Sequence, residues 1–243
     1  NTPTDVMFSF TGLATRADEH KDGFGIAFFE DRGVRLFVDP AGARVSPVAD
    51  MVRRYPIRSE NVVAHIRKAT QGRVALENTH PFMRELWGRY WVFAHNGDLV
   101  DFAPRLHAAF RPVGDTDSEL AFCWLMQELA KAHAGVPDIA ELTRTLRELL
   151  PRPAAHGSFN MLLSNGQALW AHASTSLHWL QRRHPFGAAT LADDDLSVDF
   201  AALTTPADRV AVVATEALTC DEAWHAFGAG ELAVFVAGER VGG

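Results

Sequence analysis

The 243-residue sequence lacks several features that define large classes of proteins. Its two cysteines, Cys123 and Cys220, are too few for a disulfide framework. No apolar run approaches the roughly 18 residues needed to cross a bilayer as a helix. Acidic and basic residues are interspersed, and a net charge of -7 argues against the concentrated basic face that nucleic-acid phosphate requires. We therefore expect a cytoplasmic protein that binds neither nucleic acid nor a membrane.

Signatures of several enzyme classes are also missing. The 11 histidines form no His-Glu-x-x-His motif and no Cys/His cluster, so nothing indicates a metal site. The sequence contains no Gly-x-Ser-x-Gly elbow of a serine hydrolase and no phosphate-binding loop. No repeat, low-complexity tract or linker divides the chain. We expect one domain over residues 1–243, without a cofactor.

Three segments have the apolar spacing of amphipathic helices, namely residues 46–54, 118–134 and 139–150. Ser46 is a suitable N-cap for the first helix, with Pro47 at its first helical position. Asp117 or Ser118 is expected to cap the second helix. Pro151 is expected to stop the third.

Short apolar runs bounded by turn residues predict strands before and after these helices. A glycine-flanked turn enters the run at residues 26–29, which is expected to pair with residues 34–38 across a turn. Further strands are expected at residues 61–66, 90–95, 159–164, 168–173, 179–181, 209–215 and 232–237. Strands on both sides of adjacent helices predict an α+β architecture in which sheets pack against helices.

Four polar clusters follow apolar strands or open a helix, where a rigid scaffold can present side chains. They are His65-Ile66-Arg67-Lys68-Ala69-Thr70, Asn78-Thr79-His80-Pro81-Phe82, His95-Asn96-Gly97-Asp98 and Gly114-Asp115-Thr116-Asp117-Ser118-Glu119. Each cluster alone has an ordinary structural interpretation, as a solvated arginine, a proline loop, a turn or a helix cap. Their order and spacing are more specific than any one of them.

Together the four clusters resemble the class II glutamine amidotransferases, and most closely their stand-alone, YafJ-like branch. Further stretches similar to that branch are Asn1-Thr2-Pro3-Thr4-Asp5, Phe8-Ser9-Phe10-Thr11-Gly12-Leu13, Ala75-Leu76-Glu77 before the second cluster, Arg84-Glu85-Leu86-Trp87-Gly88-Arg89, Phe110-Arg111-Pro112-Val113, Phe159-Asn160-Met161-Leu162-Leu163-Ser164 and residues 175–179. The resemblance runs from Asn1 to about Val241. It implies the fold of N-terminal-nucleophile hydrolases, a four-layer αββα sandwich.

The resemblance also implies that the protein binds glutamine and hydrolyses its side-chain amide. Arg67 matches the residue that binds the α-carboxylate, a role that suits a planar guanidinium with paired donors. Asp117 matches the counter-charge of the α-ammonium. This pair is expected to accept free glutamine or an N-terminal γ-glutamyl group, and to reject glutamine within a peptide chain.

Other residues implied by the resemblance surround the amide. The Asn96 side chain and the Gly97 N–H match the oxyanion hole, which stabilises the negative charge of the tetrahedral intermediate. Thr70 and the backbone of Lys68 match positions that line the glutamine pocket.

Three histidines near these clusters are expected to differ in role. His80 matches a loop histidine of the substrate site, although the resemblance assigns it no proton transfer. His65 and His95 are expected to be structural and to hold strand ends together.

The nucleophile of the family is a cysteine exposed at the N-terminus, whose own α-amine serves as the general base. In the YafJ-like branch, about eight residues that contain this cysteine precede the segment that matches Asn1-Thr2-Pro3-Thr4-Asp5. The first residue of the present sequence is Asn1 and not Met. Cys123 falls inside the long predicted helix and Cys220 in a turn, so both are expected to be structural. We therefore expect the nucleophile to precede Asn1.

Three functions are compatible with these residues. The first is a stand-alone amidotransferase subunit that supplies ammonia to an unidentified synthase. The second is a hydrolase of γ-glutamyl amides or peptides, and the third is a non-catalytic glutamine-binding module that lacks the cysteine. Residues 14–19 depart from the family, in which this loop is longer and richer in glycine, so we expect the entrance to differ in shape.

Overall fold

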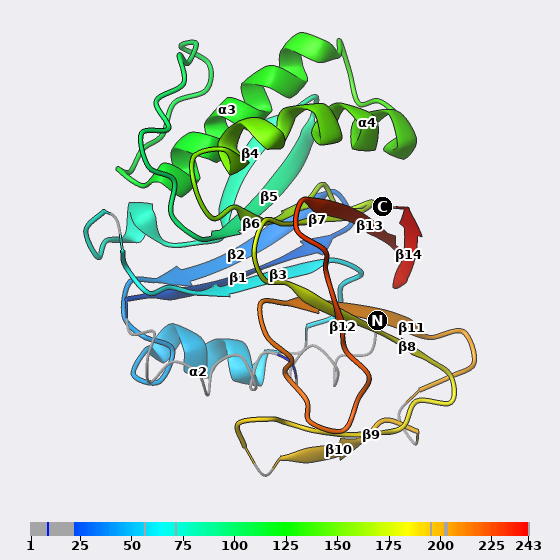
Figure 1. Cartoon of the computed structure of the whole chain (residues 1–243). Helices are drawn as coiled ribbons and strands as arrows, with labels where there is room; N and C mark the ends of the chain where they lie inside the picture. Colours follow the sequence, from blue (N-terminus) through cyan, green and yellow to red (C-terminus); the bar gives the residue numbers. More distant parts are fainter. Residues whose placement is uncertain are drawn as a thin grey trace.

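A computed structural model of the chain describes Ser9 and residues 22–55, 57–70, 72–194, 196–201 and 204–242. The motifs at residues 1–5 and 8–13 and the divergent loop at residues 14–19 therefore lie outside the described residues, apart from Ser9. The described residues form an α+β fold whose four layers, helices, sheet, sheet and helix, are visible in Figure 1. This is the expected αββα sandwich.

The larger sheet has six antiparallel strands in the order β14-β13-β7-β6-β5-β4. They are β4 (Phe82–Leu86), β5 (Arg89–Asn96), β6 (Asn160–Ser164), β7 (Leu169–Ala173), β13 (Glu231–Val236) and β14 (Glu239–Gly242). One face of this sheet packs against α3 (Asp117–Ala132) and α4 (Ile139–Leu149). Trp91, Phe93, Trp124 and Trp170 are buried in this core, which is the largest in the molecule as described.

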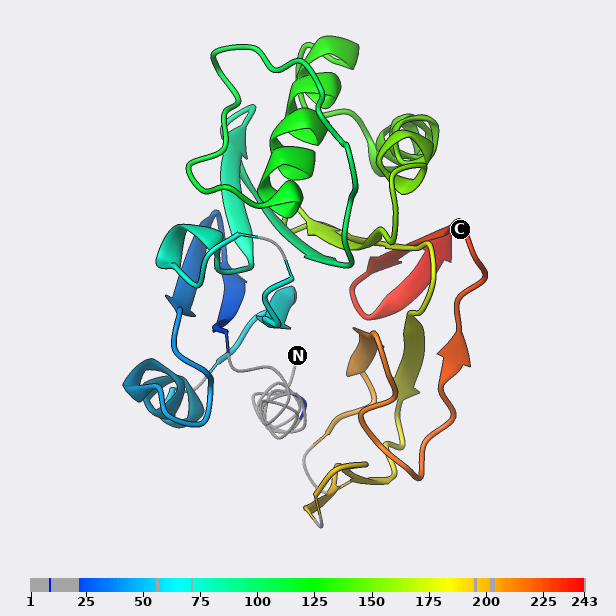
Figure 2. The ribbon, with the colours of Figure 1, turned by 60° about the vertical axis from the view of Figure 1, so that its left-hand side comes forward.

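Two three-stranded sheets cover the opposite face of the six-stranded sheet (Figures 1 and 2). The first has the order β2-β1-β3 and consists of β1 (Phe24–Glu30), β2 (Gly33–Asp39) and β3 (Val62–Ile66). The second has the order β11-β8-β12 and consists of β8 (His178–Arg183), β11 (Arg209–Ala214) and β12 (His225–Ala226). Val63 of the first sheet packs with Val92 of β5, whereas Trp179 of the second packs with Phe235 of β13. The two sheets therefore lie over different halves of the same face.

The fourth layer is α2 (Pro47–Arg54), which packs on the outer face of the β1–β3 sheet through Ala49 and Val52. Ser46 caps this helix as predicted, because its hydroxyl oxygen accepts the N–H groups of Val48 and Ala49. Smaller elements are η2 (Leu76–Asn78), α5 (Pro151–Ala154), β9 (Ala188–Thr190) and β10 (Ser197–Asp199). None of the helices in the described ranges combines the length and apolarity needed to span a bilayer.

Two details of the helices differ from the sequence-based expectation. The N-cap of α3 is Thr116, not Asp117 or Ser118, because the Thr116 side chain accepts the N–H of Glu119. Pro151 follows the end of α4 as predicted, but it also opens α5, since the fixed φ of proline suits a first helical turn. Strands β4, β9, β10, β12 and β14 were not predicted.

Candidate active site

Apart from His80, the predicted site residues come from three chain segments that meet at one end of the sheets. Arg67 follows β3, the second segment continues from the end of β5, and Asp117 opens α3. The Thr70 hydroxyl donates to the carboxylate of Asp98, which joins the first segment to the second. The Asp117 carboxylate accepts the backbone N–H of Leu99 at 2.7 Å, which joins the second to the third. The predicted grouping of these segments is therefore present in the structure.

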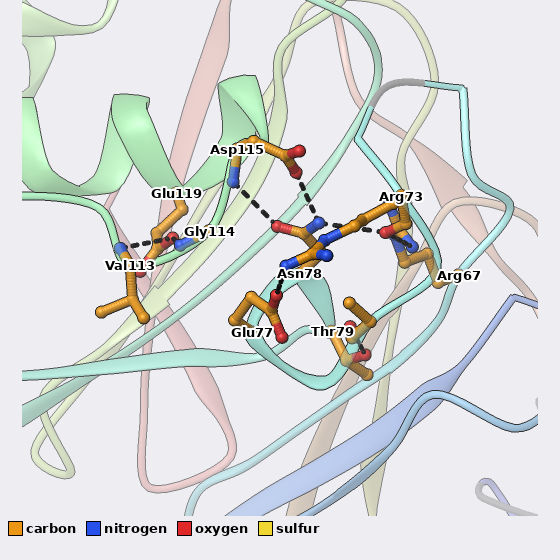
Figure 3. A network of polar contacts seen from close by, with 10 residues as sticks. Arg67, Arg73, Glu77, Asn78, Thr79, Val113, Gly114, Asp115 and Glu119 are labelled. Carbon is orange, nitrogen blue, oxygen red and sulfur yellow. Dashed lines mark hydrogen bonds and ion pairs between the residues drawn. The ribbon is translucent and has the colours of Figure 1, made fainter.

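Arg67 is only 4% exposed, although arginine normally lies at the surface. Its backbone extends the pairing of β1 with β3, because its N–H donates to Gly23 O at 2.8 Å. The guanidinium donates through Nη1 to Arg73 O at 3.2 Å (Figure 3). It also donates through Nη2 to Gly72 O at 3.4 Å. These two carbonyl oxygens therefore fix the orientation of the guanidinium plane.

Carboxylates surround this buried cation. Burial lowers the pKa of Arg67, whereas the negative charges of Asp22, Asp115 and Asp117 raise it and partly offset that effect. Guanidinium stays protonated at any physiological pH, so Arg67 is a permanent positive charge. A positive group with acidic groups beside it suits a zwitterion, whose carboxylate and ammonium need opposite partners.

Asn96 and Gly97 supply two adjacent N–H donors where β5 ends. Asn96 pairs with Asn160 of β6, and its exposed side-chain amide makes no hydrogen bond to a described residue. Gly97 has φ 141°, a region that favours glycine, and a Cβ at this position would lie 2.0 Å from Ser158 O. No described carbonyl accepts the Gly97 N–H. Two such donors on a rigid strand end can stabilise an oxyanion.

A cavity of about 420 Å³ adjoins Asn96 and separates the two three-stranded sheets. Residues 64–66 of β3 and residues 210–214 of β11 line it. Successive side chains of a strand point to opposite faces, so consecutive residues line a cavity only where the strand presents its edge. Within the described residues both β3 and β11 are edge strands. The floor of the cavity belongs to the six-stranded sheet and consists of Ala94, Asn96, Asn160, Leu162 and Leu169.

His95 connects the end of β5 to its surroundings, as expected for a structural residue. Its Nε2 lies 2.9 Å from Ser158 O, and its Nδ1 lies 2.8 Å from the Ser118 hydroxyl. A carbonyl only accepts, so Nε2 carries the proton and Nδ1 accepts from Ser118. Burial lowers the pKa of His95, against the raising effects of Ser158 O and the nearby carboxylates.

His80 lies behind the site and is not among the described residues that line the cavity. His80 is 4% exposed, and its ring packs at a tilt against the rings of His65 and Phe82, with centroids 4.4 Å and 4.5 Å away. Neither ring nitrogen hydrogen bonds to a described residue. Burial lowers the pKa of His80 well below its ordinary value, and the charges of His65, His95 and Arg67 act in the same direction. His80 is therefore neutral at physiological pH.

The remaining predicted residues lie at the margin of the site. The Lys68 and Thr70 side chains are exposed, and between them the Ala69 N–H donates to the Asp22 carboxylate at 2.8 Å. Cys123 is fully buried in α3, as predicted, and burial raises the pKa of its thiol. Cys220 is exposed, with its thiol 3.7 Å from Thr190 O. Neither cysteine belongs to the three segments.

Two buried asparagines at the site were not predicted. Asn160 accepts the N–H groups of Ser174 and Thr175, both at 3.1 Å, and donates to the Thr175 hydroxyl at 2.7 Å. Asn78 is fully buried and bonds to Asp115 and to the Arg73 carbonyl. The partners of Asn160 are 14 and 15 residues away and Asp115 is 37 residues from Asn78, so no local pattern indicated either role.

An αββα sandwich is the fold of the N-terminal-nucleophile hydrolases, and here it brings a buried cation, carboxylates and two N–H donors together at one end of its sheets. The family model of class II glutamine amidotransferases matches residues 1–242, and this chain belongs to that family. The resemblance on which the site was predicted is thereby confirmed.

The known relatives include a member of the YafJ-like branch that the sequence resembles. It is 51% identical over 245 residues to "Putative glutamine amidotransferase YafJ" of Escherichia coli (strain K12), covering 99% of this chain and 96% of that protein. It is 47% identical over 244 residues to "Putative glutamine amidotransferase" of Haemophilus influenzae, covering 99% of this chain and 83% of that protein. A 2.0 Å crystal structure of a "predicted glutamine amidotransferase" from Pseudomonas aeruginosa PA01 is 45% identical with a TM-score of 0.78, covering 93% of this chain and 88% of that one.

Proposed function

We propose that this protein hydrolyses the side-chain amide of glutamine, the glutaminase half-reaction of a class II amidotransferase, as one unit over residues 1–243. The observation that carries the proposal is that Arg67, Asp117, Asn96 and Gly97 belong to three mutually bonded segments. Arg67 binds the α-carboxylate and Asp117 the α-ammonium. Asn96 and Gly97 receive the amide oxygen as it becomes negatively charged. The backbone of Lys68 and the Thr70 hydroxyl line the substrate, and His80 supports the site from behind.

The nucleophile in this proposal is an N-terminal cysteine about eight residues before Asn1, as in the YafJ-like branch. The cavity between the edges of β3 and β11 supports this assignment, because it lies beside two edge strands of the described sheets and adjoins Asn96. Burial and a raised thiol pKa make Cys123 unsuitable as a substitute.

Each step of the reaction then has an assigned group. The cysteine sulfur adds to the amide carbon of glutamine while its proton passes to the cysteine's own α-amine. Negative charge on the amide oxygen is stabilised by Asn96 Nδ2 and the Gly97 N–H. The C–N bond breaks as the α-amine returns the proton to the departing nitrogen, and ammonia leaves. Water hydrolyses the thioester and releases glutamate.

If the protein is a stand-alone amidotransferase subunit, the released ammonia is passed to a synthase subunit. That partner is unidentified, and the proposal includes no nucleic acid, membrane or cofactor.

Both Cys123 and Cys220 are free thiols, which favours a cytoplasmic location because the cytoplasm is reducing. A γ-glutamyl amide or peptide has the same α-amino-acid end, so it competes with glutamine as the candidate substrate.

Intact mass and turnover of the protein made from its natural start test the proposal. A mass above the 26.7 kDa of residues 1–243, with release of ammonia from glutamine, supports it. A higher kcat/KM for a γ-glutamyl compound than for glutamine assigns the γ-glutamyl hydrolase instead. Glutamine binding by calorimetry without turnover, at a mass of 26.7 kDa, assigns a non-catalytic binding module.

A further inference from the structure

The buried side chain of Asn78 bonds to two of the segments that form the candidate site (Figure 3). Its Nδ2 donates to Arg73 O at 3.0 Å and to Asp115 Oδ1 at 2.5 Å. Its Oδ1 accepts the backbone N–H of Asp115 at 3.0 Å. An asparagine amide has two N–H donors, so both are used, together with one acceptor position.

On one side, Asn78 acts through the carbonyl of Arg73. This carbonyl also accepts Arg67 Nη1 at 3.2 Å, so Asn78 and Arg67 share one acceptor. The Arg73 side chain is held as well, by an ion pair with Glu77 at 2.6 Å. The position of the Arg67 guanidinium therefore depends on a turn that Asn78 holds in place.

On the other side, Asn78 fixes the entry into α3. Asp115 is bound to Asn78 through both its carboxylate and its backbone, and it stands two residues before Asp117. Glu119 fixes the same entry from the helix, since its buried carboxylate accepts the N–H groups of Val113 at 3.1 Å and Gly114 at 2.7 Å. The backbone that carries Asp117 is thus anchored on both sides.

Two glycines pack closely against the Asn78 and Asp115 side chains. A Cβ on Gly114 would lie 2.1 Å from Asn78 Oδ1. A Cβ on Gly72 would lie 2.7 Å from Asp115 Oδ1, and Gly72 also has φ +71°. A Cβ on Gly114 would also lie 2.9 Å from the backbone oxygen of Glu77, so the close approach at Gly114 and the positive φ at Gly72 both favour glycine.

We propose that Asn78 is a positioning residue that sets the separation of Arg67 and Asp117, and thereby the fit of the α-amino-acid end of the substrate. The α-carboxylate and the α-ammonium are attached to one carbon, so a site that binds both needs its cation and anion at a fixed distance. Asn78 bonds to the supports of both groups. This inference rests on the proposed function, and it assigns Asn78 to substrate binding rather than to the oxyanion.

The test uses the full-length protein and the variant Asn78→Asp. An aspartate of the same shape donates nothing to Arg73 O and repels Asp115, so KM for glutamine is expected to rise about tenfold while kcat stays within about threefold. The double variant Asn78→Asp with Asp115→Asn restores one donor and one acceptor between the two positions. Its KM is expected to recover part of the loss, as in a coupled pair.

A second substrate distinguishes positioning from a general structural role. Glutaramate keeps the carboxylate and the amide of glutamine but lacks the α-ammonium, so it does not depend on the separation of the two charges. Asn78→Asp is expected to reduce kcat/KM for glutamine about fivefold more than for glutaramate. If Asn78 only stabilised the fold, the substitution would lower kcat/KM for both substrates by the same factor.

Variants of the exposed Asp115 keep the proposal testable if Asn78→Asp does not fold. Asp115→Ala removes the acceptor, and we expect KM for glutamine to rise about threefold. Asp115→Asn keeps an acceptor for Asn78 Nδ2, and we expect KM within about twofold of the unsubstituted protein. Equal KM values for Asp115→Ala and Asp115→Asn, or equal losses for glutamine and glutaramate, would overturn the role of Asn78. An unsubstituted protein that neither binds nor hydrolyses glutamine would overturn the proposed function itself, and this role with it.

Discussion

Gly97 approaches Ser158 so closely that a Cβ on Gly97 would lie 2.0 Å from the Ser158 carbonyl oxygen. The same carbonyl accepts His95 Nε2 at 2.9 Å, so it is held in place from a second direction. The proposed oxyanion donor therefore lies on backbone that cannot move aside for a larger residue. Close packing against Ser158 and the proposed role of the Gly97 N–H in oxyanion binding therefore both favour glycine at position 97.

Gly97→Ala is expected to lower the free energy of unfolding by about 2–3 kcal/mol, because alanine is strained at φ 141° and meets rigid backbone. Urea titration measures this loss. Gly135→Ala is the matched control, since nothing lies within 4 Å of a Cβ there, and we expect a change of less than about 0.5 kcal/mol. Equal stabilities of the two variants would show that the backbone at Gly97 adapts.

Asn96→Ala is expected to lower kcat about 100- to 1000-fold with little change in KM, because an oxyanion donor acts on the transition state. The exposed Asn96 amide has no hydrogen-bond partner among the described residues, so Tm is expected to stay within about 2 °C. Ammonia release and thermal unfolding measure the two quantities. Retention of kcat within threefold would remove Asn96 from the oxyanion hole.

Arg67→Lys retains the charge but loses the planar pair of donors, so we expect KM for glutamine to rise about 10- to 100-fold. Arg144→Lys, on the exposed face of α4, is the matched control and is expected to leave KM unchanged. Steady-state kinetics of both variants test this expectation. A KM for Arg67→Lys equal to that of the control would exclude the guanidinium from carboxylate binding.

The sequence predicted best where neighbouring residues decide the structure. The start of α2 is an example, because Ser46 binds N–H groups only two and three residues away. The start of α3 was predicted less well, since Thr116, Asp117 and Ser118 are all capping residues. A distant contact decides between them, because the Asp117 carboxylate binds the N–H of Leu99, 18 residues earlier. The grouping of Arg67 and Asp117 was predictable only because the family resemblance supplied it.

Long-range polar pairs explain what the sequence did not reveal. Strand β4 was not predicted because charged residues interrupt its apolar pattern, notably Arg84. Arg84 is compensated by an ion pair with the buried Glu119 of α3, 35 residues away. Asn78 was named in the second polar cluster, but its role was not predicted for the same reason, since its partner Asp115 is 37 residues away. Such pairs join residues far apart in sequence, so no local pattern indicates them.

Three buried histidines, His80, His95 and His172, make the stability of the fold depend on pH. Burial lowers the pKa of each in the folded state, so each remains neutral there at a pH where it is protonated in the unfolded chain. For His80 the charges of His65, His95 and Arg67 add to the effect of burial. Below the unfolded pKa of about 6.5 the unfolded chain therefore binds more protons, and stability falls as pH falls.

We expect the free energy of unfolding to be constant from pH 8 to about 7 and to decrease below about 6.5, by up to about 1.4 kcal/mol per pH unit for each histidine. Urea titrations between pH 7.5 and 5.5 measure this slope before carboxylates begin to titrate. His80→Phe replaces the imidazole with an apolar ring that still faces Phe82, and it removes one of the three titrating histidines. The slope of unfolding free energy against pH is therefore expected to be shallower by about a third in this variant. A stability that rises as pH falls from 7 to 5.5 would mean that these histidines are charged in the folded protein.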